Sequence, residues 1–145
     1  MANETWRKAL YSHNIWGLPS DKSHVTCDGH LVRSRVECIV YNELMRLGVP
    51  FRYEETICLA GPDGETVKVN ADFVIRRPDG QEVILEYLGM IGDDEYLLKN
   101  AEKFRLYINN GYRLNDTLFY LTDNAGGFVD SRLIVELVQK MIMKR

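Results

Sequence analysis

Apolar side chains recur along the chain with two different periods, and these periods predict the elements of the fold. Five of them recur at the spacing of one face of a helix: Val36, Ile39, Val40, Leu44 and Leu47. Gly48 follows directly and is a typical residue for the end of a helix. This segment therefore predicts an amphipathic helix that ends at Gly48.

Three segments with the composition of β-strands come next, separated by the short turns GPDGE and RPDGQ. Residues 51–60 are rich in strand-forming residues, and residues 82–88 are apolar on both faces, as expected of a central strand. Residues 66–75 alternate strictly, which places one set on a single face: Val67, Val69, Ala71, Phe73 and Ile75. Because the connections are so short, we expect an antiparallel meander.

The second half of the chain returns to the helical period and then adds one more strand. Residues 93–110 predict a helix, with acidic residues at its positive N-terminal end and Gly111 at its C-terminus. Residues 117–122 predict a short apolar strand. This strand can lie parallel to residues 82–88, because a helix connects the two.

The chain closes with an amphipathic helix that is capped by Asp130 or Ser131 and runs through Lys144. The complete order is α-β-β-β-α-β-α, so the sequence predicts an α/β fold in which helices flank a mixed central sheet. The 145 residues suit one domain, and no linker or repeat divides them. We expect this domain to span residues 31–145, after an N-terminal extension of residues 1–30 that includes a short helix near 4–12.

Composition and charge are those of an ordinary globular protein, and they limit the cellular compartments and the partners that we expect. The chain is 46% hydrophobic and 27% charged, and no apolar run approaches the roughly 20 residues of a membrane span. The N-terminus lacks the apolar core of a secretory signal, so we expect a cytoplasmic protein without a membrane partner. Formal net charge is −3, so a nucleic-acid partner would have to be met by local basic groups.

The three cysteines are an odd number at irregular spacing, which argues against a disulfide framework and fits a reducing compartment. His24, Cys27 and His30 lie close together in the sequence and raise the alternative of a zinc site. Three ligands at such tight spacing, with no second cluster, favour instead a loop that leads into the first helix.

Two acidic residues interrupt the predicted strands and carry the strongest chemical signal. Asp72 lies in strand 66–75 and Glu86 in strand 82–88, its hairpin partner, and each faces away from the main apolar set of its strand. Two carboxylates on one face repel each other unless a cation lies between them, and oxygen ligands suit Mg²⁺ or Mn²⁺. A structural alternative has Asp72 beside a turn and Glu86 paired with an arginine. Glu37, a third acid on the preceding helix, favours the metal hypothesis.

Five motifs in this order resemble those of the PD-(D/E)XK nuclease superfamily. They are VRSRVECIVYNEL, YEE, NADFVI, VILEYLGMIGDDEY, and Lys103 followed by Tyr107, and the similarity covers roughly residues 26–140. The chain is most similar to a bacterial and phage branch with an E-(H/Y)-(L/W)-G motif. The resemblance implies a restriction-endonuclease-like α-β-β-β-α-β core. It also implies a hydrolase that cleaves DNA with Mg²⁺ or Mn²⁺ and takes no organic cofactor.

The resemblance assigns roles to individual residues. Glu37 matches the glutamate of the first helix, Asp72 the metal-binding aspartate and Glu86 the metal-binding glutamate. The backbone carbonyl of Tyr87 would join the metal ligands, and Glu37 would reach a second ion directly or through water. Glu54, in YEE, is expected to form a hydrogen bond beside the site or to pair with an arginine.

The sequence departs from the family pattern at two positions. Ala71 stands where a proline usually precedes the aspartate, and Leu88 stands where the catalytic lysine is expected. In the branch that this chain resembles, a lysine on the following helix takes that role, and Lys103 matches it. A lysine can steady the attacking water from another backbone position if its ammonium reaches the same point. Lys68 and Lys99 are the alternatives.

The leading hypothesis is therefore an endodeoxyribonuclease with four catalytic residues: Glu37, Asp72, Glu86 and Lys103. Arg33 and Arg35, at the start of the first helix, would hold the backbone of the DNA. Cutting both strands of a duplex commonly takes two sites, which allows for a homodimer. The alternative is a catalytically inactive nucleic-acid-binding module of the same fold, as the missing strand lysine and the acidic net charge suggest. An unrelated enzyme acting on a small molecule is disfavoured, because the sequence has no G-x-x-x-x-G-K loop and no Ser or Cys nucleophile motif.

Overall fold

The computed structural model describes residues 24–122 and 130–143. The elements in these ranges are β1 (His24–Val25), β2 (Leu31–Val32), α2 (Arg35–Leu47), β3 (Phe51–Ala60), β4 (Thr66–Arg76), β5 (Glu82–Leu88), α3 (Asp94–Asn109), β6 (Leu118–Thr122) and α4 (Ser131–Met143). From α2 onward their order and type are those predicted from the sequence. The short helix expected near residues 4–12 lies outside the described residues.

The central sheet has the strand order β3-β4-β5-β6 and is mixed. β3, β4 and β5 pair antiparallel, which confirms the predicted meander. β6 pairs parallel to β5, because α3 carries the chain from the end of one strand back to the start of the other. The predicted α/β fold with a mixed central sheet is therefore confirmed for the described residues.

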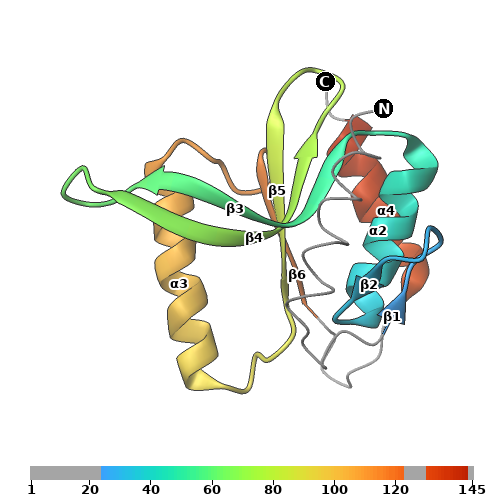
Figure 1. Cartoon of the computed structure of the whole chain (residues 1–145), viewed down its shortest axis with the longest axis horizontal. Coiled ribbons are helices and arrows are strands. Elements are labelled where there is room, and N and C mark those ends of the chain that lie inside the picture. Colours follow the sequence, from blue (N-terminus) through green and yellow to red (C-terminus); the bar gives the residue numbers. More distant parts are fainter. Residues whose placement is uncertain (1–23, 123–129, 144–145) are drawn as a thin grey trace.

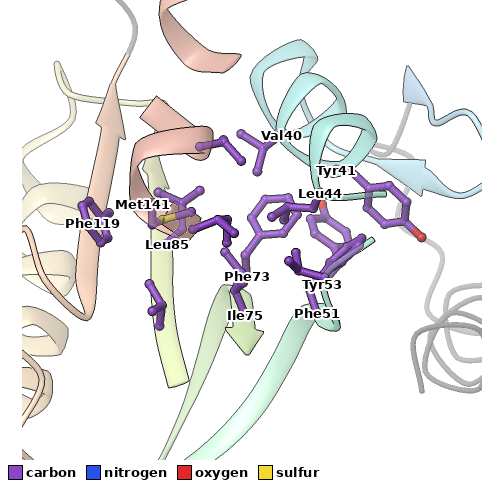
Figure 2. Close-up of a cluster of buried hydrophobic side chains, with 14 of the residues drawn as sticks. Val40, Tyr41, Leu44, Phe51, Tyr53, Phe73, Ile75, Leu85, Phe119 and Met141 are labelled. Atoms are coloured by element: carbon purple, nitrogen blue, oxygen red, sulfur yellow. The ribbon is translucent and has the colours of Figure 1, made fainter. Parts of the chain in front are cut away.

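Helices cover both faces of this sheet (Figure 1). α2 and α4 pack against each other on one face, and α3 lies on the other. The larger core, beneath α2 and α4, is rich in aromatic rings such as Tyr41, Phe51 and Phe73 (Figure 2). The smaller core, beneath α3, includes Ile84 and Leu118. Apolar packing on both faces therefore fixes the central strands that carry the predicted acids.

Both helices that carry predicted site residues begin at a capping side chain. Ser34 accepts a hydrogen bond from the N–H of Glu37 at 3.0 Å, and Asp93 accepts one from the N–H of Tyr96 at 3.1 Å. α2 ends at Gly48, whose φ of +71° is the left-handed conformation that favours glycine. The cap at Ser34 therefore sets Glu37 in the first turn of α2, at the positive end of the helix.

The strict alternation expected for residues 66–75 is wrong at one position. Ala71 packs in the core beneath α3, whereas Phe73 packs in the core beneath α2 and α4, so the facing of β4 changes between them. The ladder between β3 and β4 omits the intervening position, where Asp72 would meet Glu54, and Glu54 has a φ of +55°. A residue in this conformation bends a strand, and the hairpin curves out over α3 (Figure 1). The change of face therefore falls at the predicted metal-binding aspartate.

The residues expected to form a loop before the first helix instead form a short hairpin, in which β1 pairs antiparallel with β2. His30, at the end of the connecting turn, is buried and stacks on Tyr41 with the ring centroids 5.4 Å apart. Cys27, in the same turn, is exposed. The zinc alternative is therefore not supported, because His30 is a core residue that points away from solvent.

Asn110 ties the far end of the β3–β4 hairpin to the end of α3. Its side-chain oxygen accepts a hydrogen bond from the Ala60 N–H at 2.8 Å, and its amide donates one to the Ala60 carbonyl at 2.9 Å. We expect Asn110→Ala to lower the free energy of unfolding by about 1 kcal/mol, because two backbone groups lose their partner. Urea denaturation measures this change, with Asn109→Ala as the neighbouring control. An equal loss of unfolding free energy in both variants would contradict a stabilising role for the two hydrogen bonds between Asn110 and Ala60.

Candidate active site

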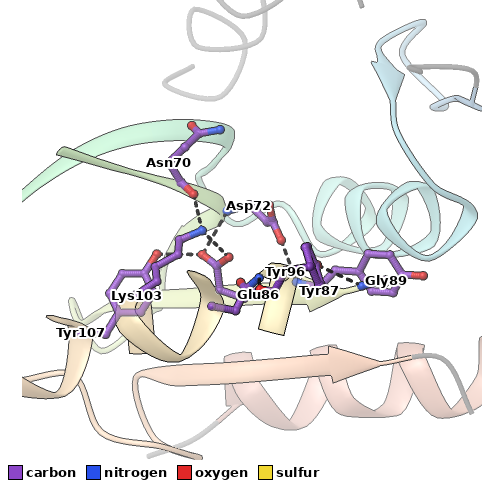
Figure 3. A network of polar contacts seen from close by, with 9 residues as sticks. Asn70, Asp72, Glu86, Tyr87, Gly89, Tyr96, Lys103 and Tyr107 are labelled. Atoms are coloured by element: carbon purple, nitrogen blue, oxygen red, sulfur yellow. Dashed lines mark hydrogen bonds and ion pairs between the residues drawn. The ribbon is translucent and has the colours of Figure 1, made fainter. Parts of the chain in front are cut away.

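The predicted acids Asp72 and Glu86 lie where β4 and β5 separate. The ladder between these strands ends at the pair Phe73 and Leu85, just before the two acids would face each other. Side chains then replace backbone partners: Asp72 accepts a hydrogen bond from the N–H of Tyr87 at 2.7 Å. Glu86 in turn accepts one from the N–H of Asp72 at 3.3 Å. The sheet therefore opens at this point, and both carboxylates are held in the opening (Figure 3).

Glu86 is almost fully buried and meets two donors from α3 (Figure 3). Its Oε1 accepts a hydrogen bond from the Lys103 ammonium at 2.7 Å, and its Oε2 accepts one from the Tyr107 hydroxyl at 2.7 Å. Lys103 also donates to the backbone carbonyl of Asn70 on β4. These contacts offset the cost of burying a carboxylate. The lysine predicted on the helix after β5 therefore reaches the acids.

Glu37 enters the same region from the first turn of α2. Its carboxyl accepts hydrogen bonds from the hydroxyls of Ser34 at 3.0 Å and Tyr53 at 3.3 Å. Together with Asp72 and Glu86 it lines a cavity of about 750 Å³. The three acids predicted from the sequence therefore border one cavity, although they come from a helix and two strands.

Burial shifts two of these acids toward their protonated forms. Desolvation, followed by the charges of Glu86 and Glu37, raises the pKa of Asp72 well above its ordinary value. Desolvation also raises the pKa of Glu37, to about 7, against the opposing hydrogen bond from Ser34. Carboxyl groups that repel one another in a buried place favour a bound cation, and such groups are enriched at functional sites.

Tyr96 fixes the end of β5 at the edge of the cavity (Figure 3). Its hydroxyl donates a hydrogen bond to the Tyr87 carbonyl at 3.1 Å and accepts one from the Gly89 N–H at 3.1 Å. The Tyr87 carbonyl is the predicted backbone metal ligand, and it therefore already has one partner. A carbonyl oxygen has two lone pairs and can accept more than one partner.

The basic residues predicted near the site differ in where they lie. Arg33 lines the cavity and pairs with Glu54, so of the two roles predicted for Glu54 the arginine partner is the one observed. Arg35 is exposed and is not part of the cavity lining. Of the two alternative lysines, Lys99 lines the cavity and Lys68 does not. In the part of the chain that the structure describes, the cavity therefore combines four acids with three cations.

The donor atoms at the opening are of the hard oxygen type. Within residues 24–122 and 130–143, no group of three or more His, Cys, Asp or Glu side chains lies close enough to hold a metal ion. The oxygen atoms at the opening that could bind a cation are those of the Asp72 and Glu86 carboxylates and of the Tyr87 carbonyl. One oxygen of Asp72 makes no hydrogen bond to the described residues. This set fits Mg²⁺ or Mn²⁺, because Mg²⁺ commonly keeps several waters and binds through one or two carboxylates.

Two tyrosines on α3 complete the site, and sequence reasoning assigned no role to either. Tyr107 donates to Glu86, and Tyr96 holds the end of β5. Their helical spacing with Lys103 placed all three on one stripe of the helix. A stripe of this kind looks the same whether its tyrosines only pack or also donate hydrogen bonds, so the sequence carried no signal for the hydroxyls.

Removing the Tyr107 hydroxyl is expected to lower the free energy of unfolding by about 1–3 kcal/mol, because a buried carboxylate oxygen loses a close donor. Tyr112→Phe is the matched control for Tyr107→Phe. The Tyr112 hydroxyl donates to Glu82 at 3.0 Å, on an exposed part of β5, so we expect a loss of about 0.5 kcal/mol or less. Urea denaturation at neutral pH measures both variants. Similar losses would contradict a special role for Tyr107.

Glu37 is expected to make the protein less stable as the pH rises. Its pKa of about 7 in the folded state lies above its ordinary value of 4.5, so the folded protein keeps a proton that the unfolded chain releases. This contribution to stability is complete below pH 4.5 and is lost as the pH rises through 7. Glu37→Gln does not titrate, so relative to the wild type it should gain up to roughly 3 kcal/mol across this range. Urea denaturation of both proteins from acid to mildly alkaline pH measures the gain, and parallel curves would contradict it.

Comparisons with protein-family models, with curated proteins and with solved structures find no match to this chain. Among the helices of the described residues, none has the length and apolar character that crossing a membrane requires. The geometry of the cavity is therefore the basis on which a function is proposed.

Proposed function

We propose that the protein is a nuclease of the PD-(D/E)XK type, which hydrolyses phosphodiester bonds in DNA with Mg²⁺ or Mn²⁺. One observation carries the proposal: Asp72 and Glu86 are held in the opening between two strands, with the Lys103 ammonium 2.7 Å from Glu86. The order α2-β3-β4-β5-α3-β6 supports a restriction-endonuclease-like core. Clustered carboxylates repel phosphate, so a cavity of this kind suits phosphate chemistry with a cation better than plain DNA binding.

The acids would hold the divalent ion. Asp72, Glu86 and the Tyr87 carbonyl would be its ligands, and Glu37 would contact a second ion directly or through water. When bound, the ion supplies Lewis-acid activation of the phosphate and lowers the pKa of a water molecule. Tyr107 and Tyr96 would keep the ligands in place, since their hydroxyls already hold Glu86 and the Tyr87 carbonyl.

Lys103 would steady the attacking water and the negative charge that builds on the phosphate. Its ammonium has three N–H donors, and two of them are directed to Glu86 and to the carbonyl of Asn70. The third has no acceptor among the described residues, so it would be available to a water or a phosphate oxygen. Both acceptors belong to strands of the sheet, so the ammonium is oriented before the substrate arrives.

A cleavage assay tests the proposal. The purified protein is incubated with supercoiled plasmid and with single-stranded DNA in the presence of Mg²⁺, Mn²⁺ or EDTA. We expect nicked or shortened DNA with at least one metal and intact DNA with EDTA. The catalytically inactive binding module predicts intact DNA in every tube together with retardation of DNA on a gel. Intact DNA without retardation would contradict both functions.

A further inference from the structure

We propose that the cavity acts on DNA whose bases are unpaired at the point of cleavage, such as a single strand or an unpaired arm beside a duplex. This inference rests on the proposed nuclease function and names its class of substrate. It follows from three features of the described residues: the depth of the acids, the apolar loop at the rim, and the small number of cations.

The acids lie deep, which limits what can reach them. Glu86 is 1% exposed and Glu37 is 4% exposed, and Asp72, which lines the cavity, is half-buried. Tyr87, Met90 and Tyr96 line the cavity next to them. The backbone of a rigid duplex lies on a wide cylinder, whereas a single strand is flexible and can bend a phosphate inward. Burial of the acids therefore favours a strand that has left the duplex.

The rim loop is residues 89–92, with the sequence GMIG; Gly89 and Met90 line the cavity, and Ile91 is the next residue along the chain. Met90 is 54% exposed and Ile91 is 48% exposed, and both follow Gly89, whose N–H is held by Tyr96. Proteins that separate or hold bases commonly place apolar side chains against the base faces. Unpaired bases next to the scissile phosphate would cover Met90 and Ile91, whereas stacked and paired bases offer no such faces.

The charge of the cavity also favours a substrate with unpaired bases. Among residues 24–122 and 130–143, three cations line it, and two of them already pair with acids: Arg33 with Glu54 and Lys103 with Glu86. Lys99 pairs with no acid of the described residues. Proteins that grip a duplex neutralise about 6–10 phosphates with lysine and arginine. The few cations that the described residues place in this cavity suit one or two phosphates, and contact with the bases would supply the rest of the affinity.

Three labelled DNAs of one sequence test the inference: a single strand, a full duplex, and a duplex with an unpaired arm. We expect the wild type to cut the single strand and the arm at least about tenfold faster than the duplex. Binding is measured by fluorescence anisotropy with Asp72→Asn, so that no DNA is cut. Adding M90S and I91S should weaken single-strand binding about tenfold and leave weak duplex binding unchanged. Leu114→Ser, at a 50% exposed residue outside the cavity lining, is the control and should change neither.

The outcomes separate the two proposals. Equal cleavage of duplex and single strand would overturn this inference and leave the nuclease function standing. Rim-dependent binding of single strands without cleavage of any DNA would overturn the nuclease function, and of the inference it would support only the preference of the cavity for unpaired strands. Binding that M90S and I91S leave unchanged would overturn the inference. A change of oligomeric state in M90S/I91S, seen by size-exclusion chromatography, would also overturn it, since the rim would then be a contact between copies of the chain.

Discussion

Asp72→Asn is expected to lower the rate of metal-dependent cleavage at least about a thousandfold and, at neutral pH, to make the protein more stable. The loss of rate follows because the amide removes a charged ligand and keeps nearly the same shape. The gain in stability follows from the raised pKa of Asp72, which is caused by burial and by the charges of Glu86 and Glu37. The folded state favours the protonated form, so the stability from this group is present at low pH and is lost as the pH rises. Asparagine has no charge to bury.

Opposite changes in rate and stability distinguish a functional acid from a structural one. Cleavage of labelled DNA gives the rate, and thermal unfolding at neutral pH gives the stability. Asp63→Asn is the control, because Asp63 lies exposed in the β3–β4 turn and should alter neither quantity. A clear loss of stability in Asp72→Asn would mean that the carboxylate is needed mainly for its hydrogen bond to the Tyr87 N–H. Full cleavage by this variant would contradict the proposed metal ligand.

Lys103→Met should lower cleavage about a hundredfold or more and should also destabilise the protein by about 2–4 kcal/mol. Methionine keeps most of the apolar stem but removes the ammonium that bonds to Glu86 and to the Asn70 carbonyl. Glu86 is then left as a buried carboxylate with one hydroxyl donor, Tyr107, and one weaker backbone donor. Unlike Asp72→Asn, this variant loses both activity and stability.

Lys99→Met is the matched control for Lys103→Met, one turn earlier on the same helix. Lys99 is exposed and lines the cavity, so its loss should change stability by about 0.5 kcal/mol or less. The rate of cleavage decides between the two lysines. A large loss of rate in Lys99→Met, with normal cleavage by Lys103→Met, would assign the catalytic role to Lys99. Urea denaturation and cleavage of labelled DNA measure all of these quantities.

Most of the fold could be predicted because local periodicity and tertiary packing agree. β3 and β5 have the predicted ends, and α2 stops at Gly48 as its glycine indicates. The strands have short turns between them, so the sequence left little choice of partner. A fold can be predicted from one sequence when the local pattern of apolar residues and the tertiary packing favour the same elements.

The site was predicted less completely, because part of it depends on how strands bend and where hydroxyls point. The change of face at Asp72 comes with the left-handed Glu54, and nothing in the residue type of a glutamate predicts that conformation. Arg77 begins the turn RPDGQ, where a basic residue is usually exposed, yet it is buried and pairs with Asp79 and Asp116. A charge pattern alone cannot distinguish an arginine that binds a partner from one that joins two loops of its own chain.

Hydrogen bonds attach α3 to the sheet near both of its ends, and Lys103 lies midway between these two contacts. Tyr96 binds the end of β5, and Asn110 binds Ala60 at the far end of β3. Each interval is seven residues, about two helical turns, so all three side chains share one face. One inserted residue between either pair would rotate the rest of the helix by about 100°. The number of helical residues therefore sets the position of the ammonium. Substitutions elsewhere on the helix leave it in place, but an insertion or deletion between Tyr96 and Asn110 would move it away from the acids.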